Sequence, residues 1–369
     1  MRVIMTGGGS GGHIYPALAI ADKIKEKEPD AEILYIGNHL GLEQDIVPRA
    51  GYPFRMVEAR WFEKNPVEIL KTVAVTLHGS NQALRIMKKF RPDVVIGTGG
   101  FVCVPVMHAG HRYRAKCFLH EQNAFPGVAN RFLEHYADRV FLGFAAASSY
   151  FKQPEKHVVV GNPVRSRFFS VDREEARRKL GLSPGQFMVF TFAGSQGANQ
   201  MTRVIYQLMK SLNGKPGVSL IFATGTMHYP EVMDKIASEG VRIQDNITIR
   251  DYINDMENYL AAADLVISRA GALSVAETCV TGAPSILVPS PNVPGNHQYF
   301  NAKAVADQGG AILIEEKDFT PERAETEIQT LMADPDRLLA MRKAARACAP
   351  EEATDRIYQE IRACLDGGK

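Results

Sequence analysis

Short apolar runs alternate with longer amphipathic segments along the first part of the chain. The runs occupy residues 2–6, 32–37, 93–97, 116–120 and 139–143. Each run is long enough for one buried strand, and the segments between them place apolar residues at helical spacing. This alternation is typical of parallel strands joined by crossover helices. We therefore expect a doubly wound α/β domain.

The same pattern begins again in the second part of the chain. Residues 158–165 interrupt it, because Asn162 and Pro163 disfavour regular structure there. A charged helix is expected over Asp172–Leu180. Further apolar runs follow at residues 187–194, 218–225, 247–253, 264–271 and 284–290. The two halves predict two doubly wound parallel-sheet domains that face one another across a cleft.

The composition is that of ordinary globular domains: 369 residues, 45% of them hydrophobic and 23% charged. The net charge of +2 provides no field that would attract nucleic acid, so no nucleic-acid partner is expected. The five cysteines form no CxxC pair, which favours reduced thiols and no zinc site. The first residues do not have the pattern of a signal peptide, and no apolar stretch approaches the roughly 18 residues of a membrane span. A cytosolic protein is therefore expected.

Glycine-rich turns stand where several predicted strands end. They are Gly7–Gly12, Gly97–Gly100, Gly194–Ala198 and Arg269–Ser274. In open α/β sheets, ligands bind at the carboxyl ends of strands, and helix N-termini at that edge attract phosphate. Two such turns in each half are more than packing requires. The pattern predicts binding of phosphate or pyrophosphate.

Two familiar phosphate motifs do not fit the first turn. Gly7, Gly9 and Gly12 match G-x-G-x-x-G, but the following strand ends at Gly37–Asn38 without the acid that binds a ribose in dinucleotide sites. A P-loop would need a lysine where His13 stands. The HEQNA segment likewise lacks the second histidine of a zinc helix. The turn therefore predicts a phosphate site that is neither an NAD site nor an NTPase site.

Seven motifs together resemble one family over nearly the full length of the chain. They are GGGSGGHIYPALAIA, GTGGFVCVP, HEQNAFPGVANRFL, VVGNPVR, FAGSQGANQ, SRAGALSVAE and HQYFNA. The chain is similar to the MurG family of bacterial lipid II synthases. The resemblance implies a GT-B fold of two Rossmann-like domains. It also implies an inverting transfer of GlcNAc from UDP-GlcNAc to the C4 hydroxyl of MurNAc in undecaprenyl-pyrophosphoryl-MurNAc-pentapeptide (lipid I), giving lipid II without a metal or other cofactor.

The resemblance implies a set of residues that bind the donor, UDP-GlcNAc. The set is Ser10, Gly11, Gly12, Asn123, Arg165, Ser195, Gln196, Gly197, Ile253, Ala272, Leu273, Glu277 and Gln298. Within it, Ser195 contacts the diphosphate, Ile253 the uracil, Glu277 the ribose, and Asn123 and Gln298 the sugar. Residue types alone leave other roles open, because a serine at a helix start can be an N-cap and an acid there can stabilise the dipole. Arg165 can equally form a salt bridge at the domain junction.

His297 marks a departure from the family pattern, because some members have paired glutamines where this chain has His297 and Gln298. The role of position 297 therefore stays open.

The first glycine turn and its partner are assigned to the acceptor's pyrophosphate. The residues are Gly9, Ser10, Gly11, Gly12, Gly99 and Gly100. His13 is the candidate general base, since a helix N-terminus keeps an imidazole neutral and able to accept a proton. It can instead fix the loop or contact the acceptor diphosphate.

The resemblance also divides the chain by function. Residues 1–163 are expected to hold lipid I and face the membrane, residues 164–345 to hold the donor, and residues 346–369 to form a helix that packs back on the N-terminal domain. Basic and apolar residues mix from Arg60 to Arg91, which fits either an anionic membrane surface or an ordinary crossover helix. The expected location is the cytoplasmic face of the cell membrane, as a peripheral protein, with other cell-wall enzymes as further partners.

Three other functions remain open from the sequence. A UDP-GlcNAc epimerase shares the two-domain layout. A glycosyltransferase acting on diacylglycerol would leave the first glycine turn without a diphosphate. A non-catalytic module could bind nucleotide sugars or polyprenyl diphosphates.

Overall fold

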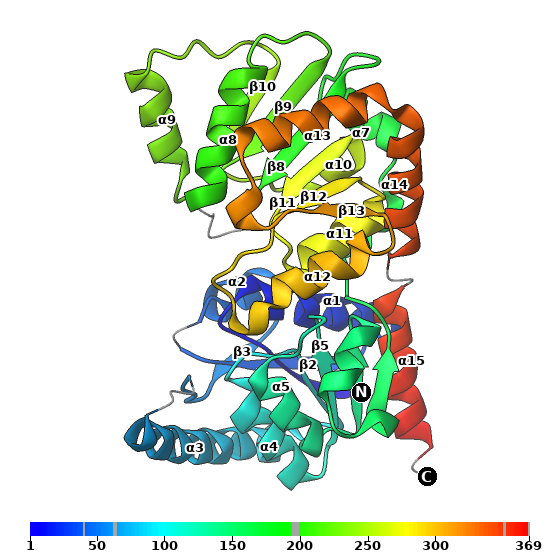
Figure 1. Cartoon of the computed structure of the whole chain (residues 1–369). Coiled ribbons are helices and arrows are strands. Elements are labelled where there is room, and N and C mark those ends of the chain that lie inside the picture. The colour runs from blue at the N-terminus through cyan, green and yellow to red at the C-terminus, as the bar shows by residue number, and fades with distance from the viewer. Residues whose placement is uncertain (40, 62–64, 194–198, 350–351, 368–369) are drawn as a thin grey trace. The chain divides into compact units, whose positions relative to one another are not determined.

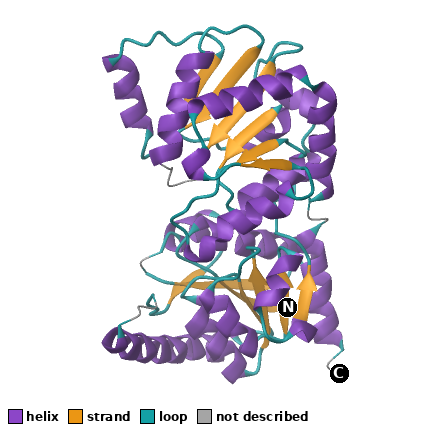
Figure 2. Cartoon of the chain, viewed as in Figure 1, coloured by secondary structure: helices purple, strands orange, loops and turns teal. Residues whose placement is uncertain are grey.

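The computed structural model describes residues 1–39, 41–61, 65–193, 199–349 and 352–367 (Figure 1). The chain divides into two compact units. Unit 1 combines Met1–Val164 with Pro350–Lys369, and unit 2 is Arg165–Ala349. Each unit is an α/β domain with its own sheet and its own helices (Figure 2).

The sheet of unit 1 contains seven strands among the described residues. They are β1 (Arg2–Thr6), β2 (Glu32–Gly37), β3 (Phe54–Met56), β4 (Val94–Gly97), β5 (Lys116–Glu121), β6 (Arg139–Leu142) and β7 (His157–Val159). Their order is β3-β2-β1-β4-β5-β6-β7, and every neighbouring pair is parallel. The strand order therefore reverses between β1 and β4, which is where doubly wound folds bind ligands.

Helices cover both faces of this sheet. The helices are α1 (Gly11–Lys27), α2 (Glu43–Arg49), α3 (Pro66–Phe90), α4 (Cys103–Tyr113), α5 (Val128–Leu133) and α15 (Ala353–Asp366), with 3₁₀ turns η1 (Glu134–Tyr136), η2 (Ala145–Tyr150) and η3 (Pro154–Lys156). Side chains of a strand alternate between the two faces. Ile4 of β1 lies in a cluster with residues of α3 and α4. Val3 and Met5 lie in a second cluster with residues of α1 and α15.

The C-terminal helix α15 packs against α1 within unit 1. Its Ile357 and Ile361 are completely buried. Asp355 forms salt bridges of 2.9 Å with both Lys23 and Lys27 of α1. The buried apolar face of α15 and the salt bridges of Asp355 therefore hold this helix against α1.

Unit 2 repeats the architecture with six parallel strands among the described residues. They are β8 (Phe187–Phe192), β9 (Val218–Ala223), β10 (Ile247–Arg250), β11 (Leu265–Ser268), β12 (Ser285–Leu287) and β13 (Ala311–Leu313). Their order is β10-β9-β8-β11-β12-β13. Here the order reverses between β8 and β11.

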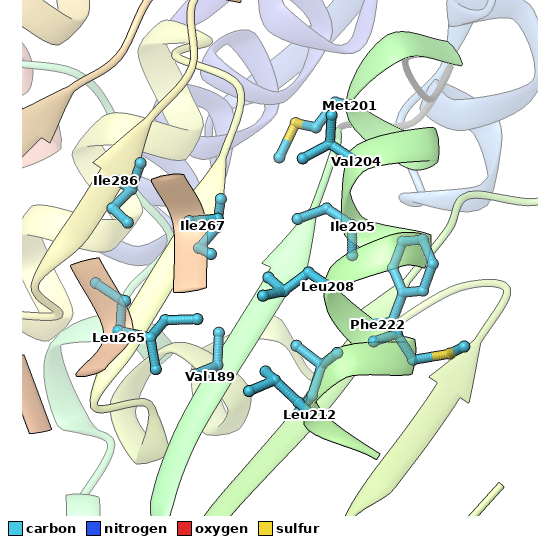
Figure 3. Packing of buried hydrophobic residues seen from close by; sticks show 14 of the residues in the cluster. Val189, Met201, Val204, Ile205, Leu208, Leu212, Phe222, Leu265, Ile267 and Ile286 are labelled. Atoms are coloured by element: carbon cyan, nitrogen blue, oxygen red, sulfur yellow. The ribbon is translucent and has the colours of Figure 1, made fainter. Parts of the chain in front are cut away.

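The helices of unit 2 again cover both faces of the sheet. They are α6 (Arg167–Ser170), α7 (Arg173–Lys179), α8 (Asn199–Leu212), α9 (Tyr229–Ser238), α10 (Met256–Ala262), α11 (Ala272–Thr281), α12 (His297–Ala306), α13 (Pro321–Ala333) and α14 (Pro335–Ala347), with 3₁₀ turns η4 (Pro294–Asn296) and η5 (Glu316–Asp318). Figure 3 shows the core between α8 and the sheet, where Val204 and Leu208 pack near Val189 of β8 and Ile267 of β11. The spacing of four residues puts the two α8 side chains on one face of the helix.

The predicted pair of doubly wound parallel sheets is confirmed. The charged helix expected over Asp172–Leu180 forms as α7, and the Asp172 side chain caps it by accepting a 2.8 Å hydrogen bond from the Glu175 amide. Several strands of unit 2 are shorter than the predicted runs, and β10, for example, ends at Arg250. Ile253 consequently lies in the connection before α10.

Candidate active site

The two glycine turns of unit 1 meet at the edge of the sheet where the strand order reverses. The Gly8 amide donates a 3.2 Å hydrogen bond to the Gly99 carbonyl. A Cβ on Gly100 would lie 2.3 Å from the Gly8 oxygen, and Gly100 has a φ of +86°. A side chain is thus excluded there by both space and backbone conformation. The fold brings the turns Gly7–Gly12 and Gly97–Gly100 into direct contact.

A buried carboxylate from α2 supports the first turn. Glu43 accepts hydrogen bonds from the amides of Gly9 at 3.1 Å and Asn38 at 3.0 Å. A Cβ on Gly8 would lie 2.3 Å from the same carboxylate. Sequence reasoning looked for an acid at the end of β2 and missed Glu43, which comes five residues after Asn38. Its bonds to the backbone show that it shapes the loop.

Helix α1 begins within this turn, at Gly11. Ser10 is its N-cap residue, with extended backbone, and its carbonyl accepts from the amides of His13 at 3.1 Å and Ile14 at 3.2 Å. The amides of a first helical turn have no carbonyl acceptors within the helix, so they can bind an anion. A Cβ on Gly12 would make only an ordinary 3.6 Å contact, with Ser10 Oγ.

His13 is held by two oxygen atoms from the residues that follow β4 and β5. Its Nδ1 lies 3.1 Å from the Thr98 carbonyl oxygen and 3.3 Å from Gln122 Oε1. Both oxygens are acceptors, so Nδ1 carries the ring proton and Nε2 carries the lone pair. A Cβ on Gly99 would lie 2.6 Å from Nδ1, so the glycine makes room for the ring.

Asn123 follows β5 and is oriented by another buried carboxylate. Glu121 accepts hydrogen bonds from the Asn123 amide at 2.9 Å and from its Nδ2 at 3.1 Å. It also accepts from the Gly127 amide at 3.1 Å and from Asn130 Nδ2 at 2.9 Å. Sequence reasoning missed Glu121 as a functional residue, although it stands inside the HEQN motif.

In unit 2, α11 begins after the glycine turn that follows β11. Gly271 is its N-cap residue, Ala272 and Leu273 form its first turn, and Glu277 lies further along the same helix. Desolvation raises the pKa of Glu277 to about 7, although the positive charges of Arg165 and Arg167 lower it in part. A carboxyl group that titrates near neutrality is typical of a functional site.

Arg269, named in the sequence only as the first residue of a glycine turn, supports the start of α11. The buried Arg269 guanidinium donates to the carbonyls of Val288 and Pro289, each at 3.2 Å, and pairs with Glu316. Asn301 Nδ2 donates a 3.1 Å bond to the Ala270 carbonyl. These bonds fix the backbone that leads into the helix.

The remaining predicted donor residues also lie in unit 2. Ile253 is buried in the connection before α10. The Arg165 guanidinium lies 5.6 Å from the ring centroid of Phe168. Gln298 is on α12, where its Oε1 accepts a 2.9 Å hydrogen bond from the Ser290 amide. Ser195, Gln196 and Gly197 lie outside the described residues.

In the described part of the chain, no group of three or more His, Cys, Asp or Glu side chains is placed to hold a metal ion. Across the same residues, no helix combines the length and apolar character needed to span a membrane.

Comparison with known proteins identifies the family. Residues 3–142 match the Glycosyltransferase family 28 N-terminal domain, and residues 188–357 match the Glycosyltransferase family 28 C-terminal domain. A UDP-N-acetylglucosamine–N-acetylmuramyl-(pentapeptide) pyrophosphoryl-undecaprenol N-acetylglucosamine transferase of Acetivibrio thermocellus is 44% identical over 363 residues, which is 98% of each chain. The enzyme of the same name from Caldanaerobacter subterraneus is 41% identical over 98% of this chain and 99% of its own.

Solved structures agree with this assignment. The crystal structure of MurG from Acinetobacter baumannii has a TM-score of 0.76 and 26% identity, covering 98% of this chain and 99% of that chain. A UDP-GlcNAc 2-epimerase from Neisseria meningitidis has a TM-score of 0.69 at 12% identity over 98% of this chain and 99% of its own, a likeness of fold alone. Sequence similarity across both units therefore favours the transferase over the epimerase. The chain belongs to the MurG family of glycosyltransferases, within glycosyltransferase family 28.

Proposed function

We propose that this protein transfers N-acetylglucosamine from UDP-GlcNAc to the C4 hydroxyl of MurNAc in lipid I, giving lipid II, with inversion and without a metal. The observation that carries the proposal is the 44% identity, over 98% of both chains, to an enzyme named for this transfer. The two glycine turns and the oriented His13 in unit 1 supply chemistry that such a transfer needs.

In this proposal, His13 is the general base. Its Nε2 accepts the proton of the MurNAc C4 hydroxyl, and the hydroxyl oxygen attacks C1 of GlcNAc. The bond between C1 and the β-phosphate oxygen breaks, and its electron pair leaves with UDP. Attack on the face opposite UDP inverts the configuration at C1. The imidazole suits this role because its Nε2 carries a lone pair that can accept a proton.

The acceptor's pyrophosphate is assigned to the glycine turns of unit 1. Ser10, Gly11 and Gly12 offer amides at the positive end of α1, while Gly9, whose own amide donates to Glu43, lines the site together with Gly99 and Gly100. The contact between the two turns supports a single anion site formed by both. Ser10, Gly11 and Gly12 also belong to the proposed donor set, since the accepting hydroxyl must meet the donor sugar.

The donor's nucleotide is assigned to unit 2. Glu277 accepts both ribose hydroxyls, and the amides of Ala272 and Leu273 at the start of α11 bind the β-phosphate. The backbone groups of Ile253 hydrogen-bond to the uracil, and Arg165 adds positive charge near Glu277. Ser195, Gln196 and Gly197 complete the diphosphate site. Asn123 and Gln298 bind GlcNAc hydroxyls through their amide side chains.

The first experiment measures transfer of radiolabelled GlcNAc from UDP-GlcNAc to lipid I, with and without EDTA. We expect labelled lipid II in both conditions, and UDP release only when lipid I is present. Conversion of UDP-GlcNAc without an acceptor would indicate an epimerase. Donor binding without turnover would indicate a non-catalytic binding module, and transfer of GlcNAc to diacylglycerol would indicate the other kind of transferase. Loss of turnover in EDTA would contradict the metal-free mechanism.

Helix α3 supports a further part of the proposal, that unit 1 docks on the cytoplasmic face of the cell membrane (Figure 1). One face of the helix buries Ala83 and Met87 in the core. Nearer the start of the helix, Leu70, Val73 and Leu77 are exposed by 72%, 49% and 51%. Their spacing of three and four residues places them on one side of the helix. Three neighbouring exposed apolar side chains favour an apolar partner.

Exposed basic residues on α3 accompany these apolar side chains. They are Lys71, Arg85, Lys88 and Lys89. Juxtaposed apolar and basic side chains suit an anionic lipid surface, where each lysine contributes about 1 kcal/mol.

We expect the double variant Lys88→Glu, Lys89→Glu to bind anionic vesicles at least about tenfold more weakly than the wild type, because two attractive charges become repulsive. Sedimentation with liposomes containing phosphatidylglycerol measures this, and neutral phosphatidylcholine liposomes should bind both proteins weakly. The matched control reverses two exposed lysines of unit 2, Lys179 and Lys317. Equal binding by all three proteins would contradict the docking proposal.

A further inference from the structure

A buried polar network lies behind His13 in unit 1. Gln122 and His120 are both buried at the end of β5, exposed by only 1% and 0%. Gln122 Nε2 lies 2.8 Å from the Thr98 carbonyl and 3.0 Å from His120 Nδ1, while Gln122 Oε1 faces His13. His120 Nε2 lies 3.0 Å from the Gly161 carbonyl. We call Gln122, His120 and the carbonyl groups of Thr98 and Gly161 the His13 relay.

Two backbone carbonyls determine the direction of every hydrogen bond in the His13 relay. The Thr98 oxygen can only accept, so the nitrogen of the Gln122 amide must face it. The Gly161 oxygen also can only accept, so His120 is protonated on Nε2. His120 Nδ1 is then an acceptor, and it receives the second proton of Gln122 Nε2.

The same reasoning fixes the oxygen of Gln122. With its nitrogen committed to Thr98 and His120, the Gln122 Oε1 atom must point toward His13 Nδ1. A flipped amide would place Oε1 against the Thr98 oxygen and would present N–H to His13. The proton on His13 Nδ1 therefore faces two acceptors, the Thr98 carbonyl oxygen at 3.1 Å and the Gln122 Oε1 atom at 3.3 Å, and the second of these is oriented by bonds that begin at Gly161.

Three further features stabilise this arrangement. Burial lowers the pKa of His120 to about 4, so the ring stays neutral at physiological pH and its Nδ1 keeps accepting. Asn162 Nδ2 donates a 3.0 Å bond to the Gln122 carbonyl. Thr98 Oγ1 donates to the His13 carbonyl at 2.7 Å, which joins the start of α1 to the end of β4.

We propose that Gln122 is a positioning residue for the transfer reaction: with its amide oriented by His120 and Thr98, it fixes the ring proton of His13 on Nδ1 and so makes Nε2 the basic nitrogen. This inference rests on the proposed role of His13 as general base. Gln122 acts only through His13, and it accepts no proton from substrate.

The variant Gln122→Met tests the proposal, because it keeps a side chain of similar length and removes both polar atoms. We expect kcat to fall about 10- to 100-fold, as for other groups that orient a reacting imidazole, with KM for UDP-GlcNAc changed by less than about twofold. A kcat of Gln122→Met within about twofold of the wild type would overturn the proposal.

A spectroscopic measurement on the free full-length chain reports the tautomer without any assay. In protein labelled with ¹⁵N-histidine, long-range ¹H–¹⁵N correlations should show His13 protonated at Nδ1, with the signals assigned by their loss in His13→Ala. In Gln122→Met we expect a mixture of both tautomers. A wild-type ring protonated at Nε2, or a tautomer that Gln122→Met leaves unchanged, would overturn the proposal.

The control variant is Glu134→Gln, which damages a different buried network of unit 1. Glu134 accepts from His157 Nε2 at 2.8 Å and from the amides of Lys152 and Gln153 at 2.9 Å each. Its loss should lower stability while leaving kcat and the His13 tautomer unchanged. If the tautomer shifts in Gln122→Met but kcat does not, the positioning role is overturned; lipid II formation by the wild type would still uphold the transferase function.

Discussion

Replacement of His13 by alanine is expected to lower kcat about 10²- to 10⁴-fold, the usual contribution of a general base, while the Kd of UDP stays nearly unchanged. The structure gives the reason for so large an effect. Thr98 and Gln122 hold Nδ1 as the protonated nitrogen, so the lone pair is on Nε2. Alanine removes the only group at this position that can take a proton.

Steady-state kinetics with lipid I, together with calorimetric titration of UDP, measure the two effects separately. The matched control is His111→Ala, which removes an exposed histidine of the same unit and should retain wild-type kcat. The alternative role, in which His13 contacts the acceptor diphosphate, predicts a raised KM for lipid I at nearly normal kcat. An unchanged kcat for His13→Ala would exclude His13 from proton transfer.

The fold follows from patterns that are local in the sequence. Runs such as Val94–Gly97 are too short and too uniformly apolar for surface helices, and the structure buries that strand completely. The extent of β10 was harder to predict, because the run over residues 247–253 continues past Arg250 into Tyr252 and Ile253. There, Asp251 accepts a hydrogen bond from the following amide, and the chain leaves the sheet.

The candidate site was only partly predictable, because its support comes from residues far apart in the sequence. Glycine at the end of β1 and β4 indicated a phosphate turn, and the structure places the two turns in contact. The partners of that turn are not visible in any local motif: Glu43 bonds Gly9 from 34 residues away, and Thr98 bonds His13 from 85 residues away. Such contacts depend on which strands become neighbours. The resemblance to a family supplied roles for Asn123 and Glu277, but not the carboxylate Glu121 that orients Asn123.

The Glu277 carboxyl should make donor binding depend on pH, and its replacement should have the second large effect. Two hydrogen bonds from ribose hydroxyls to an ionised carboxylate contribute about 1.5–3 kcal/mol each at most, so Glu277→Ala is expected to weaken UDP-GlcNAc binding about 100-fold. Donor binding should weaken as the pH falls, because protonation removes the charge of the Glu277 carboxylate. Desolvation places the pKa of Glu277 at about 7, and hydroxyl groups donate best to the ionised form.

Between pH 8 and pH 6 the ionised fraction of such a group falls from about 0.9 to about 0.1, so the Kd of UDP-GlcNAc should rise about tenfold over this range. Calorimetry without acceptor suits the measurement, because the donor's diphosphate stays ionised throughout and His13 chemistry does not contribute. Glu277→Gln cannot ionise and should give a Kd that is weaker than that of the wild type at pH 8 and independent of pH. Glu239→Gln, a change to a carboxylate that pairs with Lys210 elsewhere in unit 2, should keep the wild-type pH dependence. A wild-type Kd that does not change from pH 6 to pH 8 would show that the ribose is bound without this carboxylate. The role of Glu277 would then be limited to stabilising helix α11.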